Sequence, residues 1–511
     1  MSSSLAIVHS RASAGIEAPC VFVEAHISFG LPSFSIVGLP ETAVKESRDR
    51  VRSALLNSHF DFPNGRIVVN LAPADLPKDG GRFDLPIALG ILAATGQIPK
   101  EKLQAFEFVG ELALSGELRP IHGVLPLAIA TRQMKRQLII PAENAMEAGL
   151  ASNLIIFPAQ HLTQVCAHLL GEKLLPPYHC QTPKIQKICD LDLSDIRGQH
   201  YAKRALEIAA SGGHSLLLVG PPGTGKTMLA SRLSSILPSM TEEEALASTA
   251  ILSVACKPFD MHQWKVRPFR APHHTASSVA LVGGGSPPKP GEISLAHHGI
   301  LFLDELPEFN RTVLEALREP LESGHITISR ASYQSQFPAN FQLITAMNPC
   351  PCGHSGNPNG HCQCTFDQIQ RYQNRISGPL LDRIDMHIRI APLPKGTLSN
   401  EVKENIDTSA TVRARVESAK NIQMTRQCKS NSALKNREIE TFCSINTSDA
   451  LLLETAIDQF GLSARSYHRI LKVARTMADL ENSAVIKTQH LKEALGYRCL
   501  DRRNKQVSVN F

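Results

Sequence analysis

The sequence lacks a long apolar segment. No stretch approaches the ~18 apolar residues that a membrane-spanning helix needs, and the nearest candidate, Leu85–Thr95, has only the length of a buried helix. The first residues, Met1–Ile7, lack the basic patch and apolar core of a secretory signal. We therefore expect no membrane partner and a cytoplasmic location.

Cysteine is sparse, and neither sign of charge dominates. The 12 cysteines in 511 residues are too few for a disulfide scaffold, and four of them fall within residues 350–364, which predicts a local site. The 53 basic and 47 acidic residues leave a net charge of +6, which permits a nucleic-acid partner without requiring one. Hydrophobic residues at 43% and charged residues at 20% exclude extensive disorder. The length predicts about three or four domains.

Local patterns divide the chain into three domains and a linker. Residues 1–173 mix short β-rich stretches with helical patterns, and residues 174–190 carry three prolines with little periodicity, as a linker does. Residues 191–395 alternate short apolar strands with helices, which predicts a parallel sheet with crossover helices. Residues 396–511 lack strand patterns and are expected to be helical. The clearest expected elements are Val44–Asn57, residues 67–70 and 138–140, Ser215–Val219, Met228–Leu237, Ile300–Leu303, Val313–Ser323, Phe341–Ala346, Met386–Ile390, Leu451–Phe460 and Tyr467–Leu480.

A complete phosphate-binding loop follows the first strand of the middle domain. Its glycines let backbone N–H groups approach phosphates, and the helix that follows adds a favourable dipole. We expect Lys226 to bridge the β- and γ-phosphates of ATP and the Thr227 hydroxyl to bind Mg²⁺. The loop consists of Gly220, Pro221, Pro222, Gly223, Thr224, Gly225, Lys226 and Thr227.

Two further strands end in polar residues that suit ATP hydrolysis. Ile300–Leu303 is a continuous apolar run, typical of a strand buried on both faces, and it leads into Asp304 and Glu305. At the carboxyl end of such a strand, Asp304 is expected to hold the metal and Glu305 to activate water. Asn348, after the next strand, is expected to contact the γ-phosphate or the water, because it follows the two motifs above, although such a residue alone is more often a helix cap or turn residue.

Two arginines are candidates for the stabilisation of phosphoryl charge. Arg383 precedes the last expected strand, and Arg465 opens a helix of the final domain. Guanidinium groups stabilise a transferring phosphoryl group, sometimes from a neighbouring subunit. From their spacing alone, surface salt-bridge residues are the more common interpretation, since most arginines are solvated at the surface.

These motifs, in this order, resemble the magnesium-chelatase type of AAA+ ATPase. The resemblance continues through both ends of the chain and points to the bacterial ComM (YifB-like) family. It rests on the phosphate loop and on the segments Arg197–Gln199, Gly212–Ser215, Phe269–His274, Pro290–Gly299, Leu303–Phe309, Asn348–Gly353, Ile376–Asp385 and Val473–Leu480.

That resemblance implies an α/β fold with an AAA+ core, an N-terminal α+β domain and a C-terminal helical lid. It implies a homo-hexameric DNA helicase that uses ATP and Mg²⁺ to drive branch migration of joints formed during natural transformation, with single-stranded, forked or branched DNA as the partner. Other recombination proteins are further expected partners. It also implies that Arg383 acts in trans on a neighbouring subunit and that Arg465 senses nucleotide from the lid.

The N-terminal domain resembles the proteolytic domain of Lon. Pro77–Asp84 is similar to the segment that carries Lon's nucleophilic serine, and Gly110–Gly123 is similar to the segments around its lysine. Arg82 stands where the serine would be, and no lysine follows Gly123. Because covalent catalysis needs a nucleophile and a base, we expect an inactive protease fold. Its basic residues Lys78, Arg82 and Arg119 are candidate phosphate contacts or ordinary surface charges.

The clustered cysteines form two C-x-C pairs separated by a turn-rich loop. Four thiols from Cys350, Cys352, Cys362 and Cys364 would complete a tetrahedral Zn²⁺ shell. The alternative is a set of reduced thiols in a surface loop, since C-x-x-C is the more usual spacing.

Loops inserted between the core strands are candidate DNA contacts. Lys265–His274 carries Arg267, Arg270 and two histidines, next to Trp264 and containing Phe269, and such basic and aromatic mixtures bind single strands. The glycine-rich Val282–Gly291 and a hairpin arm at His325–Arg330 are the others, and each is equally consistent with a folded insertion. Two other functions stay open: a magnesium-chelatase-type motor that remodels a partner protein, and a protein unfoldase.

Overall fold

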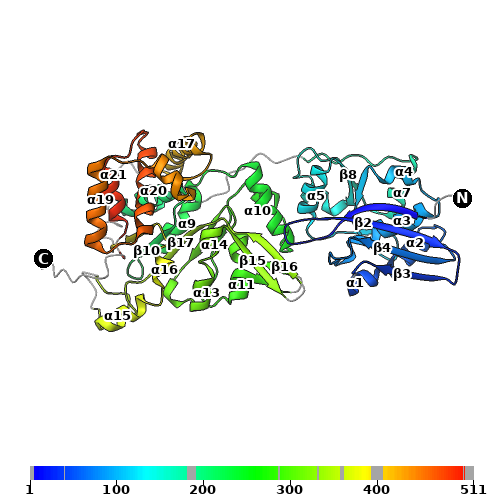
Figure 1. Cartoon of the computed structure of the whole chain (residues 1–511), viewed down its shortest axis with the longest axis horizontal. Helices are drawn as coiled ribbons and strands as arrows, with labels where there is room; N and C mark the ends of the chain where they lie inside the picture. Colours follow the sequence, from blue (N-terminus) through cyan, green and yellow to red (C-terminus); the bar gives the residue numbers. More distant parts are fainter. Residues whose placement is uncertain are drawn as a thin grey trace.

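The computed structural model describes residues 5–39, 41–180, 191–285, 288–330, 333–356, 362–392, 407–498 and 500. Figure 1 shows an elongated molecule with the N-terminal domain at one end, a sheet-containing core in the middle and a helical domain at the far end. Within the described residues, no helix combines the length and apolarity needed to cross a membrane. The part of the expected linker beyond Cys180 lies outside the described residues.

The N-terminal domain contains two larger sheets, a short two-stranded sheet formed by β6 and β7, and a largely buried helix. One sheet has the order β1-β2-β4-β3, with only the β3 and β4 pair parallel, and the other has the parallel order β5-β8-β9. Helix α3 packs on β1 and β2 through buried apolar side chains, as its uninterrupted apolar sequence predicts. The elements are β1 (Leu5–Arg11), β2 (Cys20–Ser28), β3 (Ser33–Val37), α1 (Thr42–Lys45), α2 (Ser47–Asn57), β4 (Arg66–Ala72), α3 (Asp84–Ala94), α4 (Lys100–Leu103), β5 (Phe106–Phe108), β6 (Glu111–Leu112), β7 (Leu118–Arg119), α5 (Val124–Gln133), β8 (Gln137–Pro141), α6 (Ala145–Ala148), β9 (Ile156–Ala159) and α7 (Leu162–Leu170).

The core is a five-stranded parallel sheet in the order β11-β14-β17-β10-β18. Its three central strands are buried along their whole length, because helices cover both faces. The elements are α8 (His200–Gly212), β10 (Leu216–Val219), α9 (Lys226–Ile236), α10 (Glu242–Val254), β11 (Phe269–Arg270), α11 (Ser278–Val282), β12 (Gly283–Gly284), β13 (Lys289–Pro290), α12 (Glu292–Leu295), β14 (Ile300–Leu303), α13 (Arg311–Ala316), α14 (Pro320–Ser323), β15 (His325–Arg330), β16 (Tyr333–Pro338), β17 (Gln342–Met347), α15 (Phe366–Gln373), α16 (Gly378–Leu381) and β18 (Met386–Arg389).

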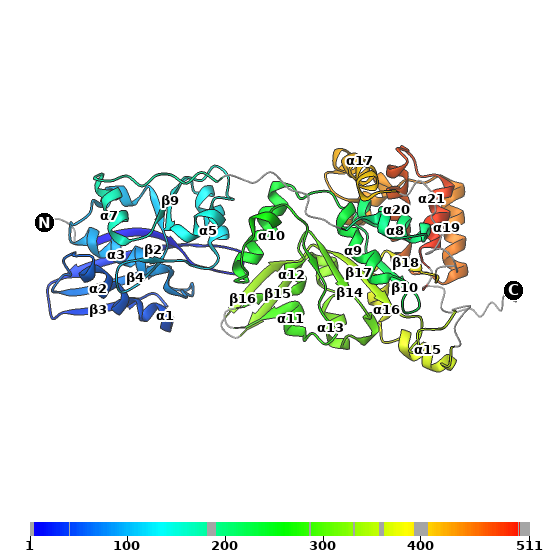
Figure 2. The same cartoon turned by 180° about the vertical axis from the view of Figure 1, so that it is seen from behind.

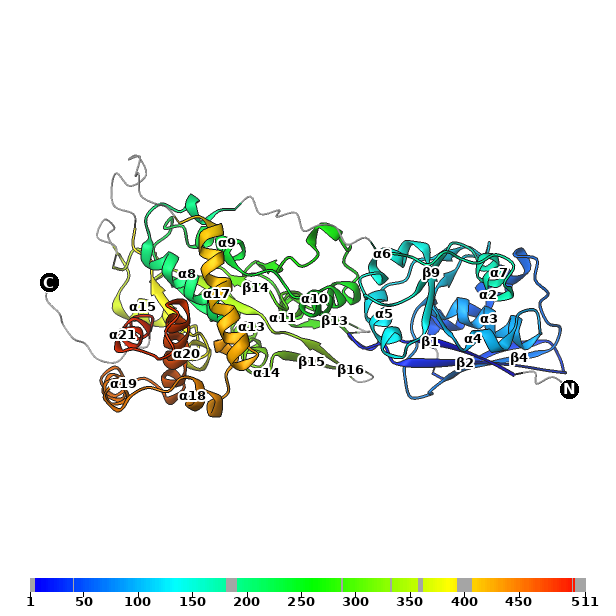
Figure 3. The ribbon, with the colours of Figure 1, turned by 90° about the horizontal axis from the view of Figure 1, so that it is seen from above.

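The C-terminal region is helical, as expected. Seen from above, α17 runs alongside the core helices (Figure 3), and it packs against α8, α9 and α20. A hydrogen bond from the Leu193 N–H to the Ser409 hydroxyl, 2.7 Å, fastens the start of α17 to the start of the core. The helices are α17 (Ser409–Gln427), α18 (Asn436–Phe442), α19 (Thr447–Phe460), α20 (Ala464–Leu480) and α21 (Thr488–Gly496).

The structure corrects two expectations about the elements. The single helix expected over Val313–Ser323 is two short helices, α13 and α14, with Pro320 starting the second, because proline lacks the N–H that a continuous helix needs. The sequence pattern also missed β11, whose two residues are too few for a recognisable strand pattern.

The N-terminal domain packs directly on the core. Helices α5 and α10 are in contact, and apolar residues from both domains form one buried cluster that includes Trp264. Figure 2 shows the β15–β16 hairpin reaching from the core toward the N-terminal domain. At the junction, an added Cβ on Gly15 would lie 3.5 Å from the Ser335 side chain, so the two backbones run close together.

Candidate nucleotide site

The phosphate loop occupies the turn between β10 and α9. Gly223 and Gly225 have φ values of 75° and 80°, in a region that glycine adopts most readily. The Lys226 ammonium donates to the backbone oxygens of Gly220 at 2.7 Å and Pro221 at 2.9 Å. Burial lowers the pKa of Lys226, while the nearby carboxylates of Asp304 and Glu305 oppose that shift.

The expected metal ligands lie together at the edge of the sheet. The Thr227 hydroxyl donates to Asp304 Oδ2 at 2.7 Å, across two neighbouring elements that the chain separates by 77 residues. The two oxygen atoms are hard ligands, and they lie together at the start of α9, where phosphate is expected to bind. Such an arrangement is suited to Mg²⁺. The sequence prediction that these two residues converge is therefore consistent with the geometry.

Glu305 follows Asp304 in a left-handed backbone conformation, with φ of 52°. Non-glycine residues adopt this conformation rarely, and it is often associated with functional sites. The Glu305 N–H donates to Asp304 Oδ1 at 2.9 Å, and its side chain is exposed, with Oε2 3.5 Å from His274 Nδ1. The carboxylate is thus accessible to a water molecule.

Asn348 completes the site from the neighbouring strand. Its side-chain oxygen accepts a 3.0 Å hydrogen bond from the Lys226 ammonium. Because β17 lies between β10 and β14 in the sheet, the carboxyl ends of these three strands bring the loop, Asp304 and Asn348 to one edge. Asn348 therefore lies at the phosphate loop, and its expected role in hydrolysis stays a prediction.

Sequence reasoning missed two residues that contact this site. Gln199 donates to the Thr224 carbonyl at 2.8 Å and so supports the loop from the side. His274, which the sequence suggested as a DNA contact, lies beside Glu305 instead. Both residues lie in segments that carry the family resemblance, but their contacts with the loop and with Glu305 come from the tertiary structure.

The Arg383 guanidinium forms an ion pair within its own chain. Its guanidinium contacts Glu322 Oε1 at 2.5 Å and donates to the Pro379 carbonyl at 2.7 Å, and its side chain is 6% exposed. Among the described residues, no hydrogen bond or ion pair joins it to the phosphate loop of the same chain. That arrangement leaves its expected action on a neighbouring subunit as a prediction.

Arg465 is exposed in the first turn of α20. Within the described part of the chain, it makes no ion pair with the loop. One turn further on, Arg469 forms an ion pair with Asp385, which precedes β18. Burial alone would raise the pKa of Asp385, but Arg469 and His214 hold it well below its usual range. This buried pair attaches the helical region to the core sheet.

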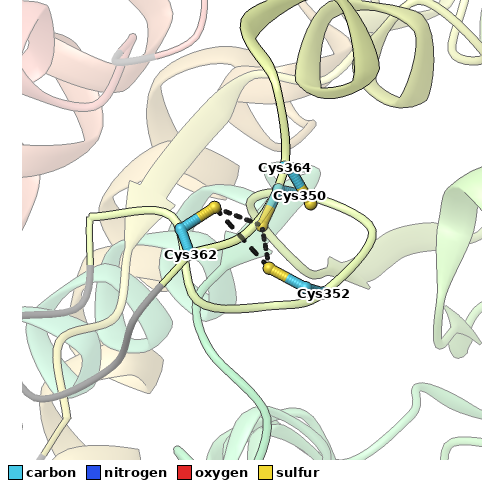
Figure 4. Close-up of side chains that lie close together, drawn as sticks. All are labelled: Cys350, Cys352, Cys362 and Cys364. Carbon is cyan, nitrogen blue, oxygen red and sulfur yellow. Dashed lines mark hydrogen bonds between the residues drawn. The ribbon is translucent and has the colours of Figure 1, made fainter.

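The four clustered cysteines converge as the sequence predicts. Figure 4 shows their side chains pointing toward one another, and their sulfur atoms all lie within 4.8 Å. The Sγ separations are 3.4 Å for Cys350 and Cys352, 3.7 Å for Cys350 and Cys362, and 3.6 Å for Cys352 and Cys362. Thiolates around a tetrahedral Zn²⁺, each about 2.3 Å from the metal, are separated by about 3.8 Å. The arrangement therefore fits zinc.

The cysteine cluster packs against the phosphate loop. Gly353 adopts φ of 81°, and an added Cβ there would lie 2.6 Å from the Pro222 ring. Cys350 is fully buried and follows Asn348 by two residues. The cysteine cluster therefore lies directly against the phosphate loop.

Two arginines of the basic stretch 265–274, a candidate DNA contact, form ion pairs within the protein. Trp264 is 5% exposed in the interdomain core. Arg267 contacts Glu244 at 2.9 Å, and Arg270 contacts Glu292 at 2.6 Å, so both guanidinium groups serve internal ion pairs. Burial also excludes Lys78 as a surface phosphate contact, since its ammonium is buried and bonded to the Pro73 carbonyl.

The predicted hairpin arm at His325–Arg330 is confirmed. It is β15, and it pairs in antiparallel register with β16. Ser329, Gln334 and Gln336 are exposed, whereas Ile326, Ile328 and Phe337 are buried. The glycine-rich stretch includes the short β12–β13 pair, and its residues 286 and 287 lie outside the described residues.

The parallel sheet and its edge define the core as an AAA+ type P-loop ATPase domain. The family described as "Magnesium chelatase, subunit ChlI" matches residues 192–398. "Subunit ChlI of Mg-chelatase" matches residues 23–144, and "Magnesium chelatase, subunit ChlI C-terminal" matches residues 406–498. These three matches cover parts of all three domains.

Relatives that are similar over their full length identify the family more closely. The chain is 54% identical to the competence protein ComM of Haemophilus influenzae over 99% of both chains, and 52% identical to the YifB protein of Escherichia coli over 98% of both. A partial match at 26% identity, over 33% of this chain and 35% of the relative, is to Lon protease 2 of Bacillus subtilis. The chain belongs to the ComM and YifB family of magnesium-chelatase-type proteins.

Proposed function

We propose that this protein is an ATP-dependent DNA motor. In this proposal, it works as a hexameric helicase that drives branch migration of recombination intermediates during natural transformation. The observation that carries the proposal is the bonded set of Lys226, Thr227, Asp304 and Asn348 beside Glu305. The DNA substrate is suggested by full-length similarity to a protein named for competence.

The site residues have distinct roles in this proposal. Lys226 binds the phosphates, and Asn348 orients the attacking water or the γ-phosphate. Glu305 takes the proton from that water. Thr227 and Asp304 would hold Mg²⁺, which would neutralise charge on the phosphate oxygens.

Two arginines would link hydrolysis to movement. Arg383 of one subunit would stabilise the transferring phosphoryl group bound to the next. For this it must exchange its contact with Glu322, whose side chain is 51% exposed. Arg465 on α20 would respond to nucleotide from the helical lid. The β15–β16 hairpin, with its polar outer face, is the proposed DNA contact.

We predict that single-stranded and forked DNA will stimulate ATP hydrolysis several-fold. A motor that moves on DNA couples its turnover to the strand, so the rate rises when the strand is bound. The measurement is the steady-state ATPase rate with and without each DNA, with Lys226→Ala as the blank. An active ATPase that does not respond to either DNA would contradict the DNA motor.

A protein-remodelling motor of the magnesium-chelatase type is the second candidate. All three matched family descriptions name that enzyme, and the nucleotide site fits such a motor equally well. Absence of DNA stimulation in a demonstrably active ATPase would favour it. The next measurement would then be ATPase stimulation by candidate protein partners.

We further propose that the cysteine cluster binds one structural Zn²⁺ per chain. Elemental analysis of the full-length protein should find it, and Cys362→Ser should lose it. We expect that variant to bind ATP but melt roughly 5–10 °C lower, because each kcal/mol is worth about 2–4 °C in domains of this size. The matched control is Cys428→Ser, an exposed cysteine outside the cluster. Zinc-free protein whose melting is unaffected by chelators would exclude the site.

A further inference from the structure

A cavity of about 510 Å³ lies at the junction of the N-terminal domain and the core. This volume falls within the range of about 300–1,000 Å³ that is typical of small-molecule sites. One wall comes from the two N-terminal segments that resemble the catalytic segments of Lon, around Arg82 and His122. The opposite wall comes from the core, at Cys256, Lys289 and Gln334.

The Arg82 side chain lines this cavity with its charge unpaired. It is only 8% exposed, and its Nη2 donates to the His122 carbonyl at 3.3 Å. Its buried Nε has no hydrogen-bond partner. A guanidinium offers five N–H donors, and a buried charge that is not directly paired with an opposite charge is costly. The arrangement calls for an anion inside the cavity.

An unsatisfied acceptor lies beside this donor. Asp79 also lines the cavity, and its buried Oδ1 lacks a hydrogen-bond partner. Asp79 is near enough to Arg82 to affect it electrostatically, but the two form no ion pair. A ligand that satisfies both residues must therefore carry an anion and a hydrogen-bond donor.

The core wall supplies a second cation. The Lys289 ammonium lies 3.9 Å from the Cys256 sulfur, and both residues line the cavity. The acidic residue Glu111 on the other wall is already within 3.8 Å of Arg119. Arg82 and Lys289 therefore place positive charge on two sides of the same space.

We propose that this cavity binds a small phosphorylated sugar or nucleotide. Arg82 and Lys289 bind its phosphate, and Asp79 accepts a hydrogen bond from a sugar hydroxyl. A nucleic-acid strand does not fit this role, because Arg82 is reached only within the cavity. Since the two walls belong to different domains, the ligand also holds the N-terminal domain against the core.

Protection of Cys256 from alkylation tests this proposal in the full-length chain. The protein carries Lys226→Ala, so that the phosphate loop does not contribute to binding. Ribose 5-phosphate and AMP are the two probes, and mass spectrometry follows the labelling of each cysteine by a maleimide. At ten times the Kd we expect Cys256 to react about tenfold more slowly, by simple occupancy. Cys428, an exposed cysteine on the C-terminal helices, is the internal control.

Substitutions of residues that line the cavity test whether the protection of Cys256 comes from a ligand bound there. Arg82→Gln should abolish it, whereas Arg119→Gln, an exposed arginine of the same domain, should keep it. If Arg82→Gln fails to fold, Lys289→Gln on the exposed core side replaces it and should weaken protection. Protection by both probes indicates that the sugar phosphate suffices, and protection by AMP alone indicates a nucleotide.

Three results would overturn the proposal. The first is identical labelling of Cys256 with and without both probes. The second is protection that persists unchanged in the cavity variants. Protection by a DNA oligonucleotide with neither small probe effective would also reject a small ligand.

Discussion

Glu305→Gln will bind ATP and fail to hydrolyse it. The substitution keeps the shape of the side chain but removes the carboxylate that accepts the proton of the attacking water, a role worth about 10²- to 10⁴-fold in rate. Lys226, Thr227 and Asp304 keep their contacts, so ATP affinity should stay within a few-fold. The variant should accumulate as ATP-bound hexamers, measured by single-turnover hydrolysis, nucleotide retention and sedimentation.

Glu308→Gln is the matched control for this result. Glu308 lies three residues further along and is also exposed, but it pairs with Arg375 at 2.8 Å and not with the nucleotide site. We expect it to hydrolyse ATP at close to the unmodified rate. Normal turnover by Glu305→Gln would show that Glu305 does not activate the water. The neighbouring His274 would then be the next candidate for that role.

Lys226→Ala will lose nucleotide affinity. The ammonium is the only side-chain cation bonded within the loop region of the described structure, where it contacts Gly220, Pro221 and Asn348. A charge-assisted hydrogen bond contributes about 1.5–3 kcal/mol, so ATP should bind roughly 10- to 100-fold more weakly. Equilibrium binding of a fluorescent ATP analogue measures this directly.

The control for the lysine is Lys257→Ala, an exposed residue after α10. It should bind ATP normally. Lys226→Ala should also melt close to the unmodified protein in the absence of nucleotide, because its ammonium bonds only to groups at the edge of the sheet. Undiminished ATP affinity in Lys226→Ala would show that the loop does not bind phosphate through this residue.

The two variants together separate binding from chemistry. Loss of hydrolysis in both, with ATP binding kept only in Glu305→Gln, is the expected pattern. The same variants then serve the DNA experiments, because a DNA effect on ATPase rate must disappear in each. Branch migration assayed on a joint molecule should stop in both.

Site residues that lie close together in the chain with strict spacing could be predicted from the sequence. The phosphate loop needs glycines, lysine and threonine within eight neighbouring positions, because one turn must surround the phosphates. The apolar run Ile300–Leu303 before Asp304 and Glu305 reflects a strand buried on both faces. The crowding of Cys350, Cys352, Cys362 and Cys364 was visible for the same reason, since a metal shell draws its ligands from short local pairs.

Contacts between residues far apart in the chain could not be predicted from the sequence. Arg267 and Arg270 have the composition of a nucleic-acid contact, but their partners Glu244 and Glu292 lie 23 and 22 residues away. Trp264 is buried because it belongs to an apolar cluster that also contains residues of α5 from the other domain. Arg383 is paired with Glu322, and no pattern in either segment indicates that contact.

The sequence by itself determined the class of ATPase, the elements that carry its site and the residues of the loop, because these depend on local spacing and on the period of apolar side chains. Only the tertiary structure decided which charges are free, which are paired inside the protein, and that a cavity with an unpaired arginine lies between two domains. The physical reason is that burial and ion pairing depend on the approach of segments far apart in the chain, and single-residue chemistry does not encode which partner each segment will meet.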